Sequence, residues 1–191
     1  MQKDKGTGKL LSTKLDTPLG EMIAVVDEDS VRLLEFADRR ALPSEITRLE
    51  PTSAGRNEVA EALAEELNEY FSGVSTSFNL KTVQYGTEFE ESVWTVLQQV
   101  PFGETRSYGD IARSIGWPEM AREVGQANGA NQISIIVPCH RVIGADGSLI
   151  GYGGGLWRKK WLLEHERKLA NKGLETKSNV LSTLESWITY A

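Results

Sequence analysis

The most informative segment of this chain is IVPCHRVIG, residues 136–144. It contains Cys139, the only cysteine among 191 residues, followed directly by His140 and Arg141. Histidine and arginine neighbours favour the thiolate of a cysteine, which is its nucleophilic form. The alternative interpretation is a buried cysteine that acts as a small apolar residue. The segment therefore marks Cys139 as a candidate nucleophile.

The chemistry of Cys139 depends on where His140 lies. Adjacent side chains of an extended segment point to opposite sides, so contact between imidazole and thiol requires a turn imposed by Pro138 or a bridging water. A catalytic imidazole also needs a second group to fix its tautomer. Glu166, beside the other histidine, His165, is the expected orienting group.

The segments that follow and precede this motif predict a strand, a loop and a helix. Residues 133–137 form a short apolar run typical of a buried strand or extended segment. Six of the 18 glycines fall between Gly144 and Gly155, which favours close approach of the backbone to a ligand. Residues 156–169 predict a helix with Glu166 toward its apolar side, where a carboxylate needs a partner.

Residues 87–128 predict three further helices. Thr87 begins the first with capping-box spacing, and Pro101 follows its end. Ser107 begins a second, short helix, and Pro118 fits the first position of a third that runs to about residue 128. Two short helices joined by a tight turn have helix-turn-helix spacing, and paired helices of an ordinary α-helical protein are the alternative.

The N-terminal part of the sequence predicts mainly strands rather than helices. Residues 9–16, 21–26 and 31–36 predict three antiparallel strands, and residues 39–56 an irregular connection with room for a short helix. A helix follows from its expected N-cap, Asn57, to Gly73. The sequence thus predicts an α+β fold with domains at residues 1–84 and 85–170, and a tail at 171–191. A short amphipathic helix is expected in the tail from Val180, Leu181, Leu184, Trp187 and Ile188.

Composition excludes several classes of protein. With 40% hydrophobic and 25% charged residues, the chain is an ordinary globular protein. One cysteine excludes an intrachain disulfide, and three Cys and His residues are too few for a tetrahedral zinc site. No apolar run could span a bilayer, and the N-terminus lacks the features of a signal peptide. We expect a cytoplasmic protein without membrane contact, metal or cofactor.

The motif resembles the PCHRV signature of the methylated-DNA protein-cysteine methyltransferases, also called O6-alkylguanine-DNA alkyltransferases. The resemblance is close over residues 87–167 and loose over residues 9–86. It extends to separate blocks in the same order, namely Ser107-Tyr108-Gly109, Ala121-Arg122, Val124-Gly125, Asn128-Gly129-Ala130-Asn131, Gly151-Tyr152 and Leu162-Leu163-Glu164-His165-Glu166.

The resemblance implies a single-turnover DNA repair reaction. Cys139 would take the alkyl group from O6-alkylguanine, and also from O4-alkylthymine, after a relay of Glu166, His140 and a water has removed the thiol proton. Tyr108 would donate a proton to guanine N3, and Asn131 would brace the turn before the active-site segment. The N-terminal sheet would be ribonuclease-H-like, and the protein would act as a monomer.

The resemblance also implies how duplex DNA is bound. The target nucleotide would be flipped out of the stack while the helix-turn-helix lies in the minor groove. Arg122 would fill the vacated stack, and the other DNA-contacting residues would be Ser107, Tyr108, Ala121 and Gly125. The alkylguanine pocket would be formed by Pro138, Val142, Tyr152, Gly153 and Gly154.

Two positions depart from the family pattern. Glu123 replaces a small residue on the helix expected to face phosphates, and Gln132 stands where proline commonly follows the asparagine. The net charge is -6, and residues 88–166 carry seven Lys and Arg against ten Asp and Glu. We therefore expect weak binding to undamaged DNA with a mild salt dependence.

Three other functions compete with this hypothesis. A lesion sensor that binds without transfer is the main alternative, but sensors related to this family replace the cysteine that is present here. A cysteine hydrolase fits poorly, since adjacent Cys and His do not form a usual dyad. A helix-turn-helix regulator lacks a second sensing cysteine and an appended DNA-binding domain.

Overall fold

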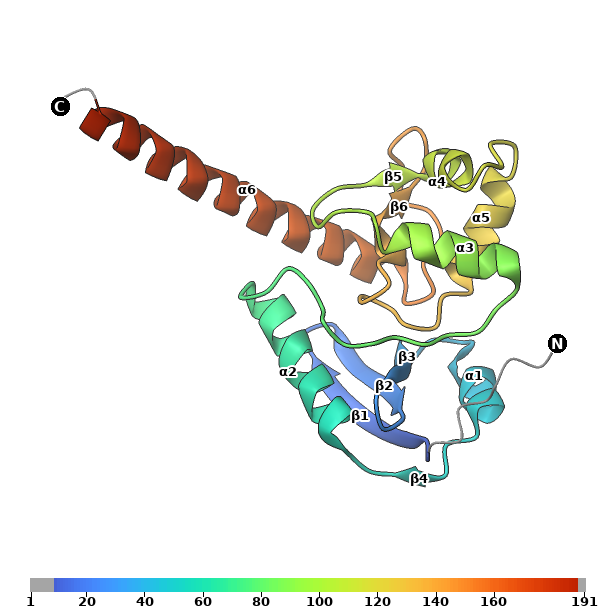
Figure 1. Ribbon diagram of the computed structural model, residues 1–191. Coiled ribbons are helices and arrows are strands. Elements are labelled where there is room, and N and C mark those ends of the chain that lie inside the picture. The colour runs from blue at the N-terminus through green and yellow to red at the C-terminus, as the bar shows by residue number, and fades with distance from the viewer. Residues whose placement is uncertain (1–8, 189–191) are drawn as a thin grey trace.

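The structure is a computed structural model that describes residues 9–188, with side chains over residues 9–172. Its first half is a sheet of strand order β3-β2-β1-β4 (Figure 1). The predicted antiparallel pairing of the first three strands is confirmed, but the fourth strand pairs parallel with β1, so the sheet is mixed. The ribonuclease-H-like description stays a prediction. The strands are β1 (Leu11–Thr17), β2 (Gly20–Val26), β3 (Val31–Phe36) and β4 (Ser53–Ala54).

Both faces of this sheet are covered. Side chains alternate along a strand, so Met22 and Ala24 of β2 join the main core while Ile23 and Val25 face the opposite side. That side is covered by α1 (Leu42–Leu49), which occupies part of the predicted irregular connection. The sheet is therefore buried on both faces near β2 and β3.

The caps of two helices lie where the sequence predicts them. In α2 (Glu58–Ser72), the Asn57 side chain accepts from the Ala60 amide, and Gly73 ends the helix with a φ of 77°. In α3 (Glu88–Leu97), Thr87 and Glu90 form the expected capping box. Each cap satisfies amide groups that the first helical turn leaves without partners.

The two short helices of the second half are α4 (Tyr108–Ser114) and α5 (Ala121–Gly129). The expected cap at Ser107 is confirmed as a capping box with Asp110. The predicted start at Pro118 is wrong, because the chain there forms a separate turn in which the Met120 amide donates to the Trp117 carbonyl at 3.0 Å. Helix α5 begins only after this turn.

The predicted strand at residues 133–137 is also wrong. Ile133 alone pairs, in a parallel bridge with Leu34 of β3. The chain then reverses through Ile135, whose φ of 74° lies in the left-handed region, and the Val137 amide donates back to the Ile133 carbonyl at 3.0 Å. A turn of this kind satisfies the buried backbone without a second strand.

The last helix is longer than expected. α6 (Leu156–Ile188) continues without a break through the predicted end near residue 169 and through most of the tail. Its interior lacks proline, and a glycine costs a helix only about 1 kcal/mol. Its second half extends away from the rest of the molecule (Figure 1). The side chains of the predicted amphipathic stripe, residues 180–188, lie outside the described ones. Within the described chain, no helix is both long and apolar enough to cross a membrane.

Strand β3 joins the two halves of the chain. The Val31 amide donates to the Lys81 carbonyl of the connecting segment at 2.9 Å, and the Leu34 amide donates to the Gln132 carbonyl at 2.9 Å. One hydrophobic cluster runs through both halves, from Leu34 to Leu162. The segment that leads to Cys139 is thus hydrogen-bonded to the edge of the N-terminal sheet.

Candidate active site

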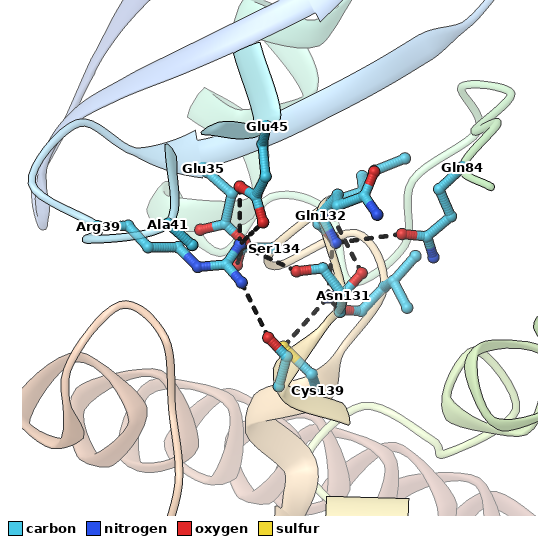
Figure 2. A network of polar contacts seen from close by, with 12 residues as sticks. Glu35, Arg39, Ala41, Glu45, Gln84, Asn131, Gln132, Ser134 and Cys139 are labelled. Atoms are coloured by element: carbon cyan, nitrogen blue, oxygen red, sulfur yellow. Dashed lines mark hydrogen bonds and ion pairs between the residues drawn. The ribbon is translucent and has the colours of Figure 1, made fainter. Parts of the chain in front are cut away.

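Cys139 begins a short 3₁₀ helix, η1 (Cys139–Arg141), and its side chain is only 4% exposed. The Asn131 side-chain amide donates to Cys139 Sγ at 3.1 Å and to the Val137 carbonyl at 3.0 Å (Figure 2). Its oxygen accepts from the Ile133 amide at 3.1 Å. Asn131 therefore braces the turn and contacts the sulfur at the same time.

The 3₁₀ turn, rather than an extended segment, places His140. His140 Nε2 lies 2.8 Å from Glu166 Oε1, and both side chains are fully buried. The pairing of His140 with Glu166 predicted from the sequence is present. His140 Nδ1 is buried and has no hydrogen-bond partner among the described residues.

Glu166 receives donors from three different segments of the chain. Arg141 donates from Nε at 2.8 Å and from a terminal nitrogen at 2.9 Å, the Tyr70 hydroxyl donates at 2.8 Å and the Gly103 amide at 3.1 Å. Burial alone would raise the pKa of Glu166, but the bonds from His140 and Arg141 outweigh it and hold the pKa well below its usual value. The carboxylate is therefore ionised.

His140 beside this carboxylate is neutral. Burial lowers the pKa of His140, against the opposing influence of Glu166, and the Arg141 guanidinium already supplies the positive charge that Glu166 needs. A neutral imidazole held by one nitrogen is a competent proton acceptor at the other.

The expectation that its neighbours lower the pKa of Cys139 is wrong for the protein without DNA. Burial raises the pKa of the thiol to about 11, although Asn131, Arg39 and Lys159 oppose the shift. His140 and Arg141 do not lower the pKa of the thiol, because His140 is neutral and Arg141 is hydrogen-bonded to Glu166. Cys139 is thus a protonated thiol at neutral pH and requires a base.

A second group of side chains lies close enough to Cys139 to interact with its charge. The Tyr108 hydroxyl donates to the Ile150 carbonyl at 3.0 Å, and Lys159 Nζ donates to the same carbonyl at 2.7 Å and to that of Gly151 at 3.2 Å. Burial, followed by the charge of Cys139, raises the pKa of Tyr108. Burial lowers the pKa of Lys159 to about 8.

Comparison with known proteins gives one consistent result. The family model described as 6-O-methylguanine DNA methyltransferase, DNA binding domain, matches residues 88–168. The methylated-DNA protein-cysteine methyltransferase of Mycobacterium leprae is 47% identical over 80% of this chain and 90% of its own length. That of Salmonella typhimurium is 42% identical over 83% of this chain and 96% of its own.

The solved structures agree with the sequence comparison. The crystal structure of Mycobacterium tuberculosis O6-methylguanine methyltransferase matches with a TM-score of 0.75 and 42% identity, over 83% of this chain and 93% of that chain. A structure of the M. tuberculosis protein in complex with DNA matches with a TM-score of 0.73, 40% identity and the same coverage. This chain belongs to the methylated-DNA protein-cysteine methyltransferase family. The α+β fold predicted from the sequence is that of these relatives.

Within this methyltransferase, the residues expected to contact DNA lie on α4 and α5. Arg122 is exposed and takes part in none of the ion pairs of the described residues, so it does not pair with Glu119, three positions earlier on the chain. A Cβ on Gly125 would lie 3.7 Å from the Tyr108 ring, which places this glycine beside the site. The Ser107 hydroxyl is engaged in the α4 cap, and Ala121 packs at the edge of the core.

The expected pocket residues are spread over two places. Val142 is buried in β6 (Val142–Ile143), which pairs with β5 (Arg106–Ser107), and Tyr152 lies close enough to Cys139 for the thiolate charge to raise the tyrosine pKa in addition to burial. Gly153 and Gly154 follow in the same loop. Pro138 instead lines a separate cavity of about 310 Å³ with Phe102 and Arg141, next to the segment of residues 76–82.

A polar network from the N-terminal half surrounds the turn before Cys139 (Figure 2). Arg39 donates to the Asn131 carbonyl at 3.1 Å, to the Gly129 carbonyl at 2.8 Å and to Glu35 at 2.6 Å. The Ser134 hydroxyl donates to the same Glu35 oxygen at 2.8 Å. The backbone amide of Gln132, one of the departures, donates to the Gln84 side chain at 3.2 Å.

Sequence reasoning missed this network and two further residues, Tyr70 and Lys159. Tyr70 occupies an apolar position of the α2 stripe, where a tyrosine indicates only packing. Lys159 lies in a run of three basic residues that is typical of a solvated helix surface. For Tyr70 and Arg39 no local signal exists, because their partners lie 96 and 90 positions away in sequence.

Proposed function

We propose that this protein repairs DNA by moving the alkyl group of O6-alkylguanine, and of O4-alkylthymine, irreversibly onto Cys139. The observation that carries the proposal is the buried thiol bonded to Asn131, next to a neutral His140 paired with Glu166. Family membership supports the same reaction. The protein would act as a monomer in the cytoplasm on double-stranded DNA.

The proton of Cys139 leaves through His140. Because burial holds the thiol pKa at about 11, Cys139 needs a base to become a nucleophile. A water between Sγ and His140 Nδ1 would take the thiol proton and pass one to the imidazole, while Glu166 stabilises the imidazolium. The sulfur then bonds to the alkyl carbon as the bond from that carbon to guanine O6 breaks.

Guanine leaves as a neutral base. The electron pair of the broken bond goes to the purine, and Tyr108 donates its hydroxyl proton to N3, after exchanging the Ile150 carbonyl for the base. The charge of Lys159, held at the same carbonyl, favours the resulting phenolate. The thioether on Cys139 has no route back to a thiol, so each molecule reacts once.

Access to the base requires a distorted duplex. Helices α4 and α5 would lie in the minor groove as a helix-turn-helix, and flipping the nucleotide costs a few kcal/mol, least for a weakened alkylguanine pair. Arg122, exposed and without an ion pair, is free to enter the vacated stack. Ser107, Ala121 and Gly125 would border the DNA backbone.

The test is mass spectrometry of the protein after mixing with duplex DNA that contains O6-methylguanine. We expect a stoichiometric gain of one methyl group on the peptide that contains Cys139, and none in Cys139→Ser. If no methyl group is gained but the lesion duplex is still bound selectively, the protein is a damage sensor and not a transferase.

A further inference from the structure

The loop of residues 150–155, here called the glycine loop, lies against the N-terminal sheet. A Cβ on Gly154 would come within 2.6 Å of the Phe36 ring, and one on Gly153 within 2.7 Å of Arg39 Nε. Contacts under 3.0 Å leave no room for a side chain on either residue. The two glycines therefore allow the loop backbone to contact the N-terminal domain directly.

Arg158, in the first turn of α6, stabilises this contact. Its Nε donates to the Leu19 carbonyl at 2.9 Å, and one terminal nitrogen donates to the Gly154 carbonyl at 2.8 Å. Both terminal nitrogens also bond the Asp38 carboxylate, at 2.8 and 3.0 Å. The guanidinium stacks 4.2 Å from the Phe36 ring centroid. The planar guanidinium of arginine presents several donors in a fixed geometry, which the ammonium group of lysine does not.

The Arg158 side chain is nearly fully buried although it bears a full charge, whereas the Asp38 side chain is 66% exposed. Solvent screens an ion pair with such an exposed partner, so Asp38 adds little to the contact. Of the bonds that Arg158 makes, those to the two backbone carbonyls, one in each half of the chain, therefore hold the loop to the sheet. Arg158 does not touch Cys139, so it acts through the loop.

We propose that Arg158 positions the glycine loop on the N-terminal sheet and thereby sets the width of the alkyl pocket and the range of O6 substituents that Cys139 accepts. The inference rests on the proposed function. Tyr152, next to Gly153, packs against the core cluster that contains Cys139, and the charge of a Cys139 thiolate raises its pKa in addition to burial. A loop released from the sheet widens the pocket and loosens its fit around a small group.

The test compares two substrates of different size. In Arg158→Met, which keeps the side-chain volume and removes the donors, we expect methyl transfer from duplex O6-methylguanine to slow at least about tenfold, since small misplacements of reacting groups are costly. Benzyl transfer from free O6-benzylguanine should slow much less. The ratio of methyl to benzyl rate constants then falls several-fold, and an unchanged ratio overturns the inference.

Matched variants separate positioning from stability. Arg56→Met removes an exposed ion pair with Glu61 and should leave the ratio as in the wild type. Asp38→Asn keeps both carbonyl bonds of Arg158 and should also leave it unchanged. Should Arg158→Met fail to fold, Arg158→Lys, which retains the charge but not the fork, must show a smaller shift in the same direction.

A second readout does not depend on alkyl transfer. The single cysteine allows the rate of carbamidomethylation by iodoacetamide to report on Cys139 alone. Release of the glycine loop should raise this rate in Arg158→Met and not in Arg56→Met. If the wild type transfers no methyl group, the proposed function fails, and this labelling still decides whether Arg158 holds the loop over the thiol.

Discussion

Two buried carboxylates, Glu166 and Glu35, have pKa values shifted in opposite directions. Glu166 accepts from His140 and Arg141, which lower its pKa. Burial raises the pKa of Glu35 to about 7, because Arg39 and Ser134 offset the desolvation only in part and one oxygen has no partner. Glu166 is thus ionised at neutral pH, whereas the pKa of Glu35 lies at about 7.

Glu166→Gln should impair both stability and transfer. The change leaves Arg141 with an uncompensated buried charge, and breaking a buried ion pair in this way costs about 3–5 kcal/mol. It also removes the group that orients His140, so we expect methyl transfer to fall about 100-fold. Urea unfolding and single-turnover transfer measure the two effects. Transfer at the wild-type rate would contradict the relay.

The stability of the protein should respond to pH through both residues. Because the folded pKa of Glu166 is depressed, its contribution is present above the usual pKa of 4.5 and is lost as the pH falls below it. Because the folded pKa of Glu35 is raised, the folded state binds more protons between pH 4.5 and about 7, and stability falls as the pH rises through that range.

Glu35→Gln therefore should flatten the fall in unfolding free energy between pH 5 and 7, measured by urea titration at several pH values. Exposed Glu61→Gln is the control and should leave that slope unchanged. A slope unaltered by Glu35→Gln would mean that Glu35 is ionised throughout this range.

At the scale of elements, α5 combines an exposed arginine with an acidic residue. Glu123 is half-buried in the first turn of the helix, one position after Arg122. A carboxylate there opposes the approach of phosphates and favours its own helix N-terminus. Under the proposed function, we expect this helix to bind a distorted lesion site in preference to ordinary duplex DNA.

Glu123→Ala should tighten binding to undamaged duplex a few-fold and steepen its salt dependence by up to about 0.9 in the slope of log K against log salt, the value for one added phosphate contact. Fluorescence anisotropy at several salt concentrations measures both. If the wild type already shows a steep salt dependence, Glu123 and the other acidic residues of the second half do not weaken binding to DNA as we infer.

At the scale of the whole molecule, the N-terminal half takes part in the site of the second half. Tyr70 of α2 donates to Glu166 across 96 positions, and Arg39 follows β3 and bonds the backbone before Cys139. His165 also contacts the Tyr70 carbonyl at 3.0 Å. The N-terminal half is therefore part of the scaffold of the candidate active site.

Tyr70→Phe tests this coupling with the removal of one oxygen. We expect a loss of about 1 kcal/mol in unfolding free energy, the usual net value of a hydrogen bond, and a slowing of methyl transfer by several-fold. Ser72→Ala, which removes an exposed side-chain hydroxyl at the end of the same helix, is the control for transfer. A transfer rate equal to that of the wild type would confine Tyr70 to packing.

Local sequence determined much of this protein. Turn residues and apolar runs placed β1 to β3, and the caps at Asn57, Thr87 and Ser107 placed their helices, since these signals act over a few residues. The cysteine motif and its flanking blocks identified the family, and the Cys139, His140 and Glu166 set was named from them.

The tertiary structure decided the rest. The strand predicted at residues 133–137 is a turn, in which only Ile133 pairs with β3 and the chain reverses at Ile135. The thiol expected to be acidic is protonated, because folding buries it and commits Arg141 to Glu166. The contributions of Arg39, Tyr70 and Arg158 depend on partners far away in sequence, and only packing brings such partners together.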